Sequence, residues 1–555
     1  MAATDIIWDY VVVGAGVAGS VLASRLRQYD QSLNILLLEA GSDTRSREDI
    51  LYANANPVGG DLDWNFKTEP IPGFQNRETV IGQGKGLGGS AAINMAGWVR
   101  GSAHEYDDWA DMVGDDRWRF NNQLPYMKMS ETWPTKENSD VHGYSGPIQV
   151  ATSKSTGRDF PLRDALAQKG LESIGIKPLP HLDGFSGDNL GYATSVEARV
   201  VGKRQIPTAA YPMDGVTILV DTLVEKILSE PGVNGTGLRA TGVLLASGEE
   251  VKAKNVISCA GAFQSPKLLM LSGIGAKKEL EAHDIEVKVD LPEVGKNLGD
   301  HLVFFQFWKL RNPEKGYALG SSNPLFQQPQ FGMGIPIDWV TCATVGKEKL
   351  SEAISKDEGA TPTASHRLLK HDRSFNELLV IYLAFSPANP VIPMDGSHLN
   401  TAVISLLPTS RGSIGLRSAK ASDPPVISPN YLDTEVDRYV YRDGLRSMAK
   451  LMLDTEFGKE YIEGETAPDN VDPIRLDSSD EYLDERIANG AVTSWHPHGG
   501  CSMGKVVDSG LKVSGFENLY VVDSSVIPVA LSTHLMAPVY ALAEQAAAIL
   551  SGKEQ

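Results

Sequence analysis

Cysteine is scarce in this chain of 555 residues, which contains only Cys259, Cys342 and Cys501. Three cysteines cannot form the disulfide framework of a small secreted domain, and they suit a reducing compartment. Long hydrophobic runs are also lacking, since no stretch approaches the ~20 apolar residues that span a bilayer. The first residues show neither the basic nor the apolar segment of a signal peptide. We therefore expect a soluble, cytoplasmic protein.

Positive charge is in deficit as well. The chain has 51 Lys and Arg residues against 70 Asp and Glu residues, for a net charge of −19. A surface of this sign repels phosphate backbones and anionic lipids, so we expect neither nucleic acid nor a membrane as a partner. The composition, 42% hydrophobic and 22% charged, is ordinary for globular proteins and excludes a disordered chain.

What is present begins with a βαβ unit. Residues 9–13 are a continuous apolar run, typical of a buried parallel strand, and a turn with Gly14, Gly16 and Gly19 follows. A helix is predicted over 20–26, and a second strand over 35–38 ends at Glu39. This is the dinucleotide fingerprint, in which backbone at Gly16 approaches a pyrophosphate and the acid accepts from ribose hydroxyls. The unit alone does not separate FAD from NAD.

The rest of the chain gives weaker structural signals. Strands are expected over 149–151, 217–220 and 256–258, and helices over 439–454 and 538–550. Residues 309–375 are polar and poorly periodic. We interpret them either as an elaborated loop with short elements over a pocket or as a plain surface insertion.

Further motifs identify a family. Residues 84–94 form a glycine-dense segment, residues 261–275 form a second motif, and Trp-His-Pro-His-Gly-Gly-Cys begins at Trp495. Together with residues 521–525 and 532–536, they make the chain resemble the glucose–methanol–choline (GMC) family of FAD-dependent oxidoreductases, of the aryl-alcohol oxidase and choline dehydrogenase type. The resemblance runs from about residue 9 to the C-terminal helix.

The resemblance implies an α/β fold. A Rossmann-like FAD-binding domain would be interleaved with an antiparallel-sheet substrate domain. We assign residues 1–150, 195–305 and 495–555 to the FAD-binding domain. Residues 151–194 and 306–494 are left for the substrate-binding domain.

The resemblance also implies which residues bind the cofactor. The glycine turn and Glu39 would hold the ADP half, Val224 would meet the adenine, and Asp523 would bond near the ribityl chain. Met536, before the last helix, would present its backbone to the flavin. The implied set is Gly14, Gly16, Val17, Ala18, Glu39, Ala40, Gly88, Ser90, Asn94, Met95, Gly97, Trp98, Val224, Trp495, Asp523 and Met536. No metal site is expected, because no His or Cys spacing indicates one.

The mode of FAD attachment follows from one position. Ile93 stands where some members of the family carry a histidine that is bonded covalently to the flavin. Isoleucine cannot form that bond. We therefore expect FAD to be bound noncovalently.

Two histidines are the expected catalytic residues. Removing an alcohol proton requires a base with a pKa near neutrality, which histidine supplies. The resemblance places His496 as the base and His534 as the partner that orients the hydroxyl, although a coupled pair could act in reverse. His498 is expected to support the site as a hydrogen-bond donor that does not touch the substrate. His301 is expected to be structural.

These residues predict that the chain oxidises a primary or secondary alcohol to a carbonyl, with O2 or another electron acceptor. Trp495 and the cluster Phe304, Phe305 and Trp308 could line an apolar or aromatic pocket. Two alternatives stay open. The pattern from Trp495 to His498 also resembles FAD-containing hydroxynitrile lyases, and FAD could be purely structural in a non-redox flavoprotein.

Overall fold

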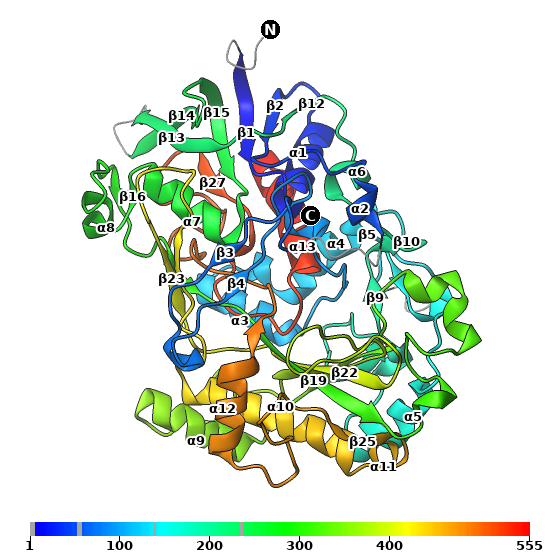
Figure 1. Cartoon of the computed structure of the whole chain (residues 1–555). Helices are drawn as coiled ribbons and strands as arrows, with labels where there is room; N and C mark the ends of the chain where they lie inside the picture. Colours follow the sequence, from blue (N-terminus) through cyan, green and yellow to red (C-terminus); the bar gives the residue numbers. More distant parts are fainter. Residues whose placement is uncertain (1–5, 53–57, 137–139, 233–236, 555) are drawn as a thin grey trace.

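The computed structural model describes residues 6–52, 58–136, 140–232 and 237–554, and it is built around two large sheets (Figure 1). The first has the strand order β12-β2-β1-β15-β14-β13, with β27 also beside β15. Its parallel strands are β1 (Ile7–Val13), β2 (Ile35–Leu38), β12 (Val216–Leu219), β15 (Glu250–Ser258) and β27 (Leu519–Val521). Strands β13 (Val224–Pro231) and β14 (Leu238–Leu245) extend it in antiparallel fashion.

The first βαβ unit forms as its sequence predicts. Every residue of β2 is buried, as a continuous apolar strand between covered faces requires. Helix α1 (Val17–Tyr29) begins directly after the glycine turn and packs beside α13 (Met536–Ser551). Gly19 allows α1 to lie close against the glycine turn, because a Cβ there would lie 1.9 Å from the Gly14 carbonyl oxygen. The predicted strands over 9–13 and 35–38 and the helix over 20–26 are confirmed.

The second sheet is antiparallel throughout. Its order is β25-β19-β22-β21-β20-β8, with β26 also beside β19. The strands are β8 (Gly191–Thr194), β19 (Leu302–Leu310), β20 (Trp339–Ala343), β21 (Asn376–Ile381), β22 (His398–Ser405), β25 (Ile462–Glu465) and β26 (Val492–Thr493). These strands lie in sequence between those of the first sheet, so the two sheets are interleaved along the chain. The predicted domain boundary at residue 305 falls inside β19.

Helices cover the far side of the second sheet, in the lower part of Figure 1. They are α9 (Lys347–Glu358), α10 (Glu435–Leu453) and α12 (Asp480–Gly490). Helix α10 packs on β21 and β22 and on α9. Even α10, with 19 residues, has charged side chains throughout, and none of the helices within the described ranges is long and apolar enough to cross a membrane.

For residues 309–375 the sequence predicts either a loop with short elements over a pocket or a plain surface insertion, and two segments are more regular than either. Strand β20 lies inside the second sheet, and α9 is a regular helix. Helix α9 buries only Leu350, Ala353 and Ile354, so its sparse apolar stripe is hidden among charged residues. Between β19 and β20 the chain forms short 3-10 turns over Pro313–Lys315, Pro324–Gln327 and Pro329–Gly332, and residues 359–375 after α9 are irregular.

Smaller elements connect the two sheets. The helices are α3 (Ala103–Val113), α4 (Phe120–Ser130), α7 (Gly261–Leu271) and α11 (Glu456–Tyr461), with short turns α2 (Glu48–Leu51), α5 (Arg163–Ala165), α6 (Pro207–Ala210) and α8 (Lys277–Glu281). The short strand pairs are β3 (Phe66–Lys67) with β4 (Val80–Ile81), β5 (Glu131–Thr132) with β6 (Ile148–Gln149), β7 (Ala151–Thr152) with β9 (Val196–Glu197), β10 (Arg199–Val200) with β11 (Lys203–Arg204), and β16 (Ile274–Gly275) with β17 (Val289–Asp290). Strands β18 (Lys296–Leu298), β23 (Gly412–Gly415) and β24 (Val426–Ser428) form a small sheet.

Candidate functional site

A cavity of about 1220 Å³ connects the two sheets. At one end it meets Val13 and Leu38, the last residues of β1 and β2, and at the other it meets Val303 and Leu379 of the second sheet. Pockets for drug-sized ligands measure ~300–1,000 Å³. This cavity therefore has room for a dinucleotide and a small second molecule together.

The glycine turn leaves open space where an anion would bind. A Cβ on Gly16 would have Gly89 Cα, at 3.8 Å, as its nearest neighbour, so the cavity reaches the backbone there. No side chain caps the N-terminus of α1, so its first N–H groups remain available. Free N–H groups at the positive end of a helix favour phosphate. These residues therefore fit a pyrophosphate.

Glu39 holds the glycine turn in place. Its two carboxylate oxygens accept from Ala15 N at 3.0 Å and from Gly41 N at 2.8 Å. Burial raises the pKa of Glu39 to about 6, although these backbone hydrogen bonds oppose the shift. The carboxylate thus links the ends of β1 and β2 while it also lines the cavity.

Asp523 plays a similar part after β27. It accepts from Gly261 N at 2.9 Å, Ser265 Oγ at 2.6 Å and Ser525 N at 2.8 Å. Burial raises the pKa of Asp523. The carboxylate thereby ties β27 to the start of α7 along the cavity wall.

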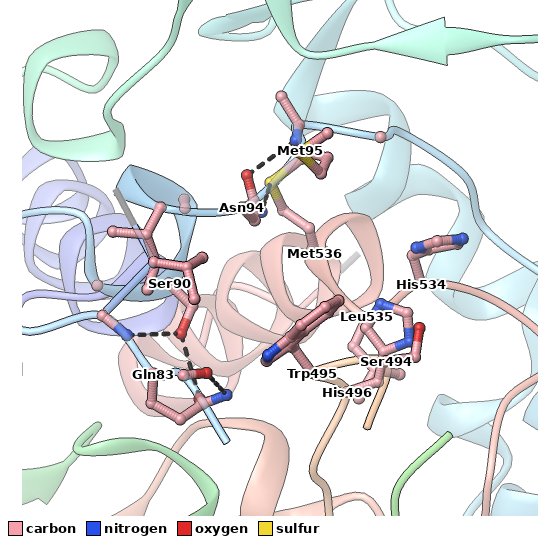
Figure 2. A pocket seen from close by; sticks show the side chains of 18 of the residues that line it. Gln83, Ser90, Asn94, Met95, Ser494, Trp495, His496, His534, Leu535 and Met536 are labelled. Atoms are coloured by element: carbon pink, nitrogen blue, oxygen red, sulfur yellow. Dashed lines mark hydrogen bonds between the residues drawn. The ribbon is translucent and has the colours of Figure 1, made fainter. Parts of the chain in front are cut away.

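A loop from the glycine-dense segment meets the start of α13 (Figure 2). Asn94 Nδ2 donates to Met536 Sδ at 3.1 Å, and Asn94 Oδ1 accepts from Arg204 Nη1 at 2.9 Å. Ser90 Oγ donates to Gln83 Oε1 at 3.2 Å. This wall is therefore held by side chains that are far apart in the sequence.

The structure brings most of the predicted cofactor residues to the cavity. Those that line it are Gly14, Gly16, Val17, Ala18, Glu39, Ala40, Ser90, Asn94, Met95, Gly97, Val224, Trp495, Asp523 and Met536. Gly88 and Trp98 do not. Gly88 has a φ of +95° and turns the chain behind the wall, where a Cβ would lie 3.0 Å from Ile206.

Trp98 faces away from the cavity because the chain alternates. Gly97 and Val99 line the cavity, so the residue between them points to the opposite side. There the Trp98 ring is buried, lies 5.3 Å from the Tyr540 ring, and donates from Nε1 to Glu131 Oε2 at 2.7 Å. Its predicted place around a flavin ring is therefore corrected to a place in the core.

His496 and His534 lie together beside the N-terminus of α13. Their ring centroids are 4.5 Å apart and the rings are almost perpendicular, at 75°. In Figure 2 the two rings lie on one side of the view, and Ser90 and Gln83 lie on the other. Both histidines line the cavity. The two residues predicted as a catalytic pair thus form a pair in space.

Asp300 fixes the backbone that carries His496. One carboxylate oxygen accepts from His496 N at 2.9 Å, and the other accepts from Tyr431 Oη at 2.6 Å and Thr493 Oγ1 at 2.7 Å. Burial raises the pKa of Asp300 to about 6. Trp495, beside His496, has a φ of +59°, a left-handed backbone that these contacts help to hold.

The surroundings shift the pKa values of the two histidines in opposite directions. Burial lowers the pKa of His496 well below its ordinary value, and the neighbouring His534 and His301 add to this. Burial also disfavours the charged form of His534, but the charge and hydrogen bond of Glu377 outweigh it and raise the pKa of His534. At neutral pH, His496 is therefore neutral, whereas His534 keeps a second proton to higher pH than an ordinary histidine does.

Glu377 was not identified from the sequence. Its Oε2 lies 2.9 Å from His534 Nε2, and it also lines the cavity. It stands in β21, 157 residues before His534, and no motif marks it. Only the folding of the second sheet brings it to the site.

His301, which was expected to be structural, contacts His496 directly. Its Nδ1 lies 3.1 Å from His496 Nδ1, and its side chain is fully buried. His498 lies behind the pair, with Nδ1 3.3 Å from the His496 carbonyl oxygen. Burial and the charge of Arg411 lower the pKa of His498 to about 3, so it is neutral. His498 does not line the cavity.

The predicted aromatic lining is partly corrected. Phe305 and Trp495 line the cavity, but Phe304 and Trp308 do not. In β19 alternate residues face opposite sides, so Val303 and Phe305 face the cavity. The buried Trp308 instead donates from Nε1 to Thr401 Oγ1 at 2.9 Å.

The site offers no evident metal ligands. Across the described ranges, no group of three or more His, Cys, Asp and Glu side chains could hold a metal ion. The three cysteines are free and buried. The titratable residues that line the cavity are Glu39, Arg199, Cys259, Lys267, Glu377, His496, Asp523 and His534.

Comparisons with known proteins agree with this geometry. Two family models described as GMC oxidoreductase match residues 8–303 and 408–543. The GMC-type oxidoreductase acuG of Aspergillus aculeatus is 37% identical over 98% of this chain and 99% of its own. The oxygen-dependent choline dehydrogenase of Pectobacterium carotovorum subsp. carotovorum is 34% identical over 97% of this chain and 94% of its own.

A solved structure extends the likeness to the fold. The crystal structure of pyridoxine 4-oxidase from Mesorbium loti has a TM-score of 0.81 at 27% identity. It covers 97% of this chain and 98% of its own. The chain therefore belongs to the GMC family of FAD-dependent oxidoreductases.

Proposed function

We propose that this enzyme oxidises a primary or secondary alcohol to a carbonyl with noncovalently bound FAD. The observation that carries the proposal is the pairing of a neutral His496 with a Glu377-supported His534 on the wall of the cavity. The flavin supplies the acceptor for the hydride that leaves the carbinol carbon. O2 or another acceptor would then take up the electrons.

His496 is the proposed base. Its Nδ1 lies 3.1 Å from His301 Nδ1, and in the tautomer that we propose it donates Nδ1–H to that atom, which leaves the Nε2 lone pair free for the substrate hydroxyl proton. The low pKa of His496 keeps this nitrogen unprotonated before the reaction. As the proton moves to Nε2, the C–H hydride leaves and the C–O double bond forms.

His534 is the proposed orienting partner. Its Nε2 faces Glu377, which raises the pKa of the ring and so favours the doubly protonated form, in which Nδ1–H can donate to the substrate oxygen. A cationic donor stabilises the developing alkoxide more than a neutral donor does. The two histidines thus divide acceptance and donation between them.

The second sheet is the proposed substrate side of the cavity, formed from residues 151–194 and 306–494. The apolar side chains that these residues bring to the cavity are Leu319, Phe326, Phe331, Ile335, Ile337, Val340, Leu379, Ile381, Leu383 and Ile404. Val303 and Phe305 join them from the first half of β19, just before the boundary. Such a wall favours an alcohol with an aromatic or apolar body. The cofactor side comprises residues 1–150, 195–305 and 495–555.

The lyase alternative is not favoured. The two relatives described above are named as an oxidoreductase and a dehydrogenase. The pattern that suggested it depends on His498, which lies behind the cavity wall. In a non-redox flavoprotein, the opposite pKa shifts of His496 and His534 would also have no role in proton transfer.

An anaerobic screen tests the proposal. The holoenzyme is mixed without oxygen with benzyl alcohol, 1-phenylethanol, choline and glucose, and the flavin absorbance is followed. We expect an aryl alcohol to bleach the flavin and to yield its carbonyl in equal amount. Cleavage of mandelonitrile with no bleaching by any alcohol would replace alcohol oxidation with the lyase reaction.

A further inference from the structure

The segment that carries His534 is tied to the rest of the protein two residues earlier, at Ser532. The Ser532 carbonyl oxygen accepts from Asn189 Nδ2 at 2.8 Å. The Ser532 hydroxyl donates to Glu105 Oε2 at 2.5 Å. Because Ser532 and Glu105 are both buried, water does not compete for the second contact. The backbone and the side chain of Ser532 are therefore both held just before the chain reaches His534.

Asn189 links Ser532 to the chain that leads into Glu377. Its Nδ2 donates to Ser532 O, and its Oδ1 accepts from Ser374 Oγ at 2.9 Å. Ser374 lies three residues before Glu377, and Ser532 lies two residues before His534. One side-chain amide therefore spans the two segments whose own side chains meet at 2.9 Å, through His534 Nε2 and Glu377 Oε2.

The two segments that Asn189 joins differ in how firmly the backbone holds them. Beside Ser374, Phe375 is bonded on both sides, because its N–H donates to Ala343 O and its carbonyl accepts from Leu406 N, both at 2.9 Å. Residues 532–535 belong to no helix or strand. Their position relative to β21 therefore depends on side-chain contacts such as that of Asn189.

A second route connects the same two segments through a buried ion pair. Glu105 Oε1 pairs with Arg373 Nη1 at 2.7 Å, and both side chains are fully buried. Arg373 is the neighbour of Ser374, so the routes through Glu105 and Asn189 join Ser532 to adjacent residues. Loss of the Asn189 contact should therefore loosen the segment without releasing it completely.

The titration of His534 reports its contact with Glu377. Burial lowers the pKa of His534, but the charge and the hydrogen bond of Glu377 outweigh this effect and raise it. The other charged or titratable groups on the elements around this ring are His496, His301, Glu105 and Arg373. A displacement of His534 away from Glu377 should therefore lower the pKa of His534.

We propose that Asn189 is a positioning residue that holds His534 against Glu377 from outside the cavity. Asn189 is half-buried in the loop before β8 and does not line the cavity, so it has no direct contact with a substrate there. Where it concerns the reaction rate, the inference rests on the proposed alcohol oxidation. The placement of the His534 ring can be measured without any alcohol.

A titration of His534 tests this placement directly. The FAD-loaded enzyme is labelled with carbon-13 at histidine Cε1, the His534 signal is assigned by its absence in His534→Asn, and its pKa is followed by nuclear magnetic resonance. In Asn189→Ala this pKa should fall, in the same direction as in Glu377→Gln but by less, because the Glu105 contact remains. Asn122→Ala is the matched control, since the exposed Asn122 also donates from Nδ2 to a backbone carbonyl, that of Asp116, at 2.8 Å. It should leave the pKa of His534 unchanged.

A double-mutant cycle separates positioning from general damage to the fold. Asn189→Ala should slow anaerobic flavin reduction by up to ~10²-fold, the cost of misplacing a reacting group by about 1 Å. In the Glu377→Gln background the same change should have a much smaller effect, because the contact through which Asn189 acts is already weakened. Asn122→Ala should reduce the flavin at the unaltered rate.

Two results would overturn the proposal. One is an unchanged pKa of His534 in Asn189→Ala, and the other is a rate loss in the double variant equal to the product of the two single losses. If Asn189→Ala does not fold, Ser374→Ala takes its place, because it removes the hydroxyl that donates to Asn189 Oδ1 and should lower the same pKa. If no alcohol reduces the flavin, the proposed function fails, and the titration of His534 still decides the role of Asn189.

Discussion

His534 Nε2 lies 2.9 Å from Glu377 Oε2, and the Glu377 side chain is 3% exposed. A carboxylate that is buried against an imidazole stabilises the protonated ring and fixes which nitrogen faces it. The second nitrogen, Nδ1, is then the one available to a ligand. Glu377, in strand β21 of the second sheet, therefore controls both the charge and the ring orientation of His534.

The pH dependence of flavin reduction should reflect the titration of both His496 and His534. Because the folded-state pKa of His534 is raised, the His534–Glu377 pair is complete below the ordinary histidine value and is lost as pH rises through the raised pKa. Because the pKa of His496 is lowered, the base is lost only at acidic pH. The rate of anaerobic reduction should therefore be bell-shaped with a broad plateau.

Glu377→Gln isolates the basic limb of that profile. Glutamine keeps the size of the side chain but removes the charge that raises the pKa of His534. The basic limb should move to lower pH, and the acidic limb, set by His496, should stay in place. Stopped-flow reduction measured across the pH range checks this. A basic limb that does not move would mean that another group produces it.

Alanine substitutions separate the roles of the histidines. His496→Ala should slow flavin reduction by ~10²–10⁴-fold, the usual contribution of a positioned base, with FAD still bound. His534→Asn should be milder than His534→Ala, because asparagine can still donate a hydrogen bond. His498→Ala is the neighbouring control and should slow flavin reduction less than His496→Ala or His534→Ala does. Wild-type rates in both His496→Ala and His534→Ala would refute the assignment.

Asp300 should matter for stability as well as for rate. Asp300→Ala leaves Tyr431 Oη, Thr493 Oγ1 and His496 N without their acceptor. An unsatisfied buried group costs about 1–3 kcal/mol, so the melting temperature should fall clearly. Asp300→Asn keeps one acceptor oxygen, so its melting temperature should fall less than that of Asp300→Ala. Thermal unfolding at equal FAD occupancy measures this, and equal melting temperatures for all three proteins would exclude Asp300 as the anchor.

The βαβ unit was predictable because local sequence specifies it. The apolar run before Gly14, the glycine spacing and the acid at Glu39 are all set within about forty residues of chain. His496 and His534 were predictable because each lies in a family motif. These signals are short-range, and none of them depends on how the second sheet folds.

What could not be predicted depends on long-range pairing. Glu377 reaches the cavity through β21, whose register partners for Glu377 are Cys342 in β20 and Ile404 in β22. Helix α9 was missed because its charged surface hides a short apolar stripe. Trp98 was misplaced because a motif gives the order of residues but not which side of an extended chain faces the ligand.

The cofactor should leave the protein on denaturation. Ile93 lines the cavity, is buried, and has no nucleophilic atom to bond to a flavin. Acid precipitation should release all of the FAD into the supernatant, where its absorbance equals that of the native sample. A yellow pellet, or a fluorescent protein band after denaturing electrophoresis, would show a covalent bond through some other residue.

The dinucleotide end is tested at Gly16. A Cβ there would have only Gly89 Cα within 4 Å, so Gly16→Val can fold, yet its methyl groups would occupy the space in front of the α1 N-terminus. A pyrophosphate needs that space, because it binds against backbone N–H groups. The purified variant should therefore be almost colourless, while its far-UV circular dichroism matches that of the unaltered protein. Gly464→Val is the matched control, since a Cβ at Gly464 meets nothing within 4 Å and Gly464 does not line the cavity. This control should keep its full flavin content. Normal flavin content in Gly16→Val would mean that the phosphates bind elsewhere along the cavity.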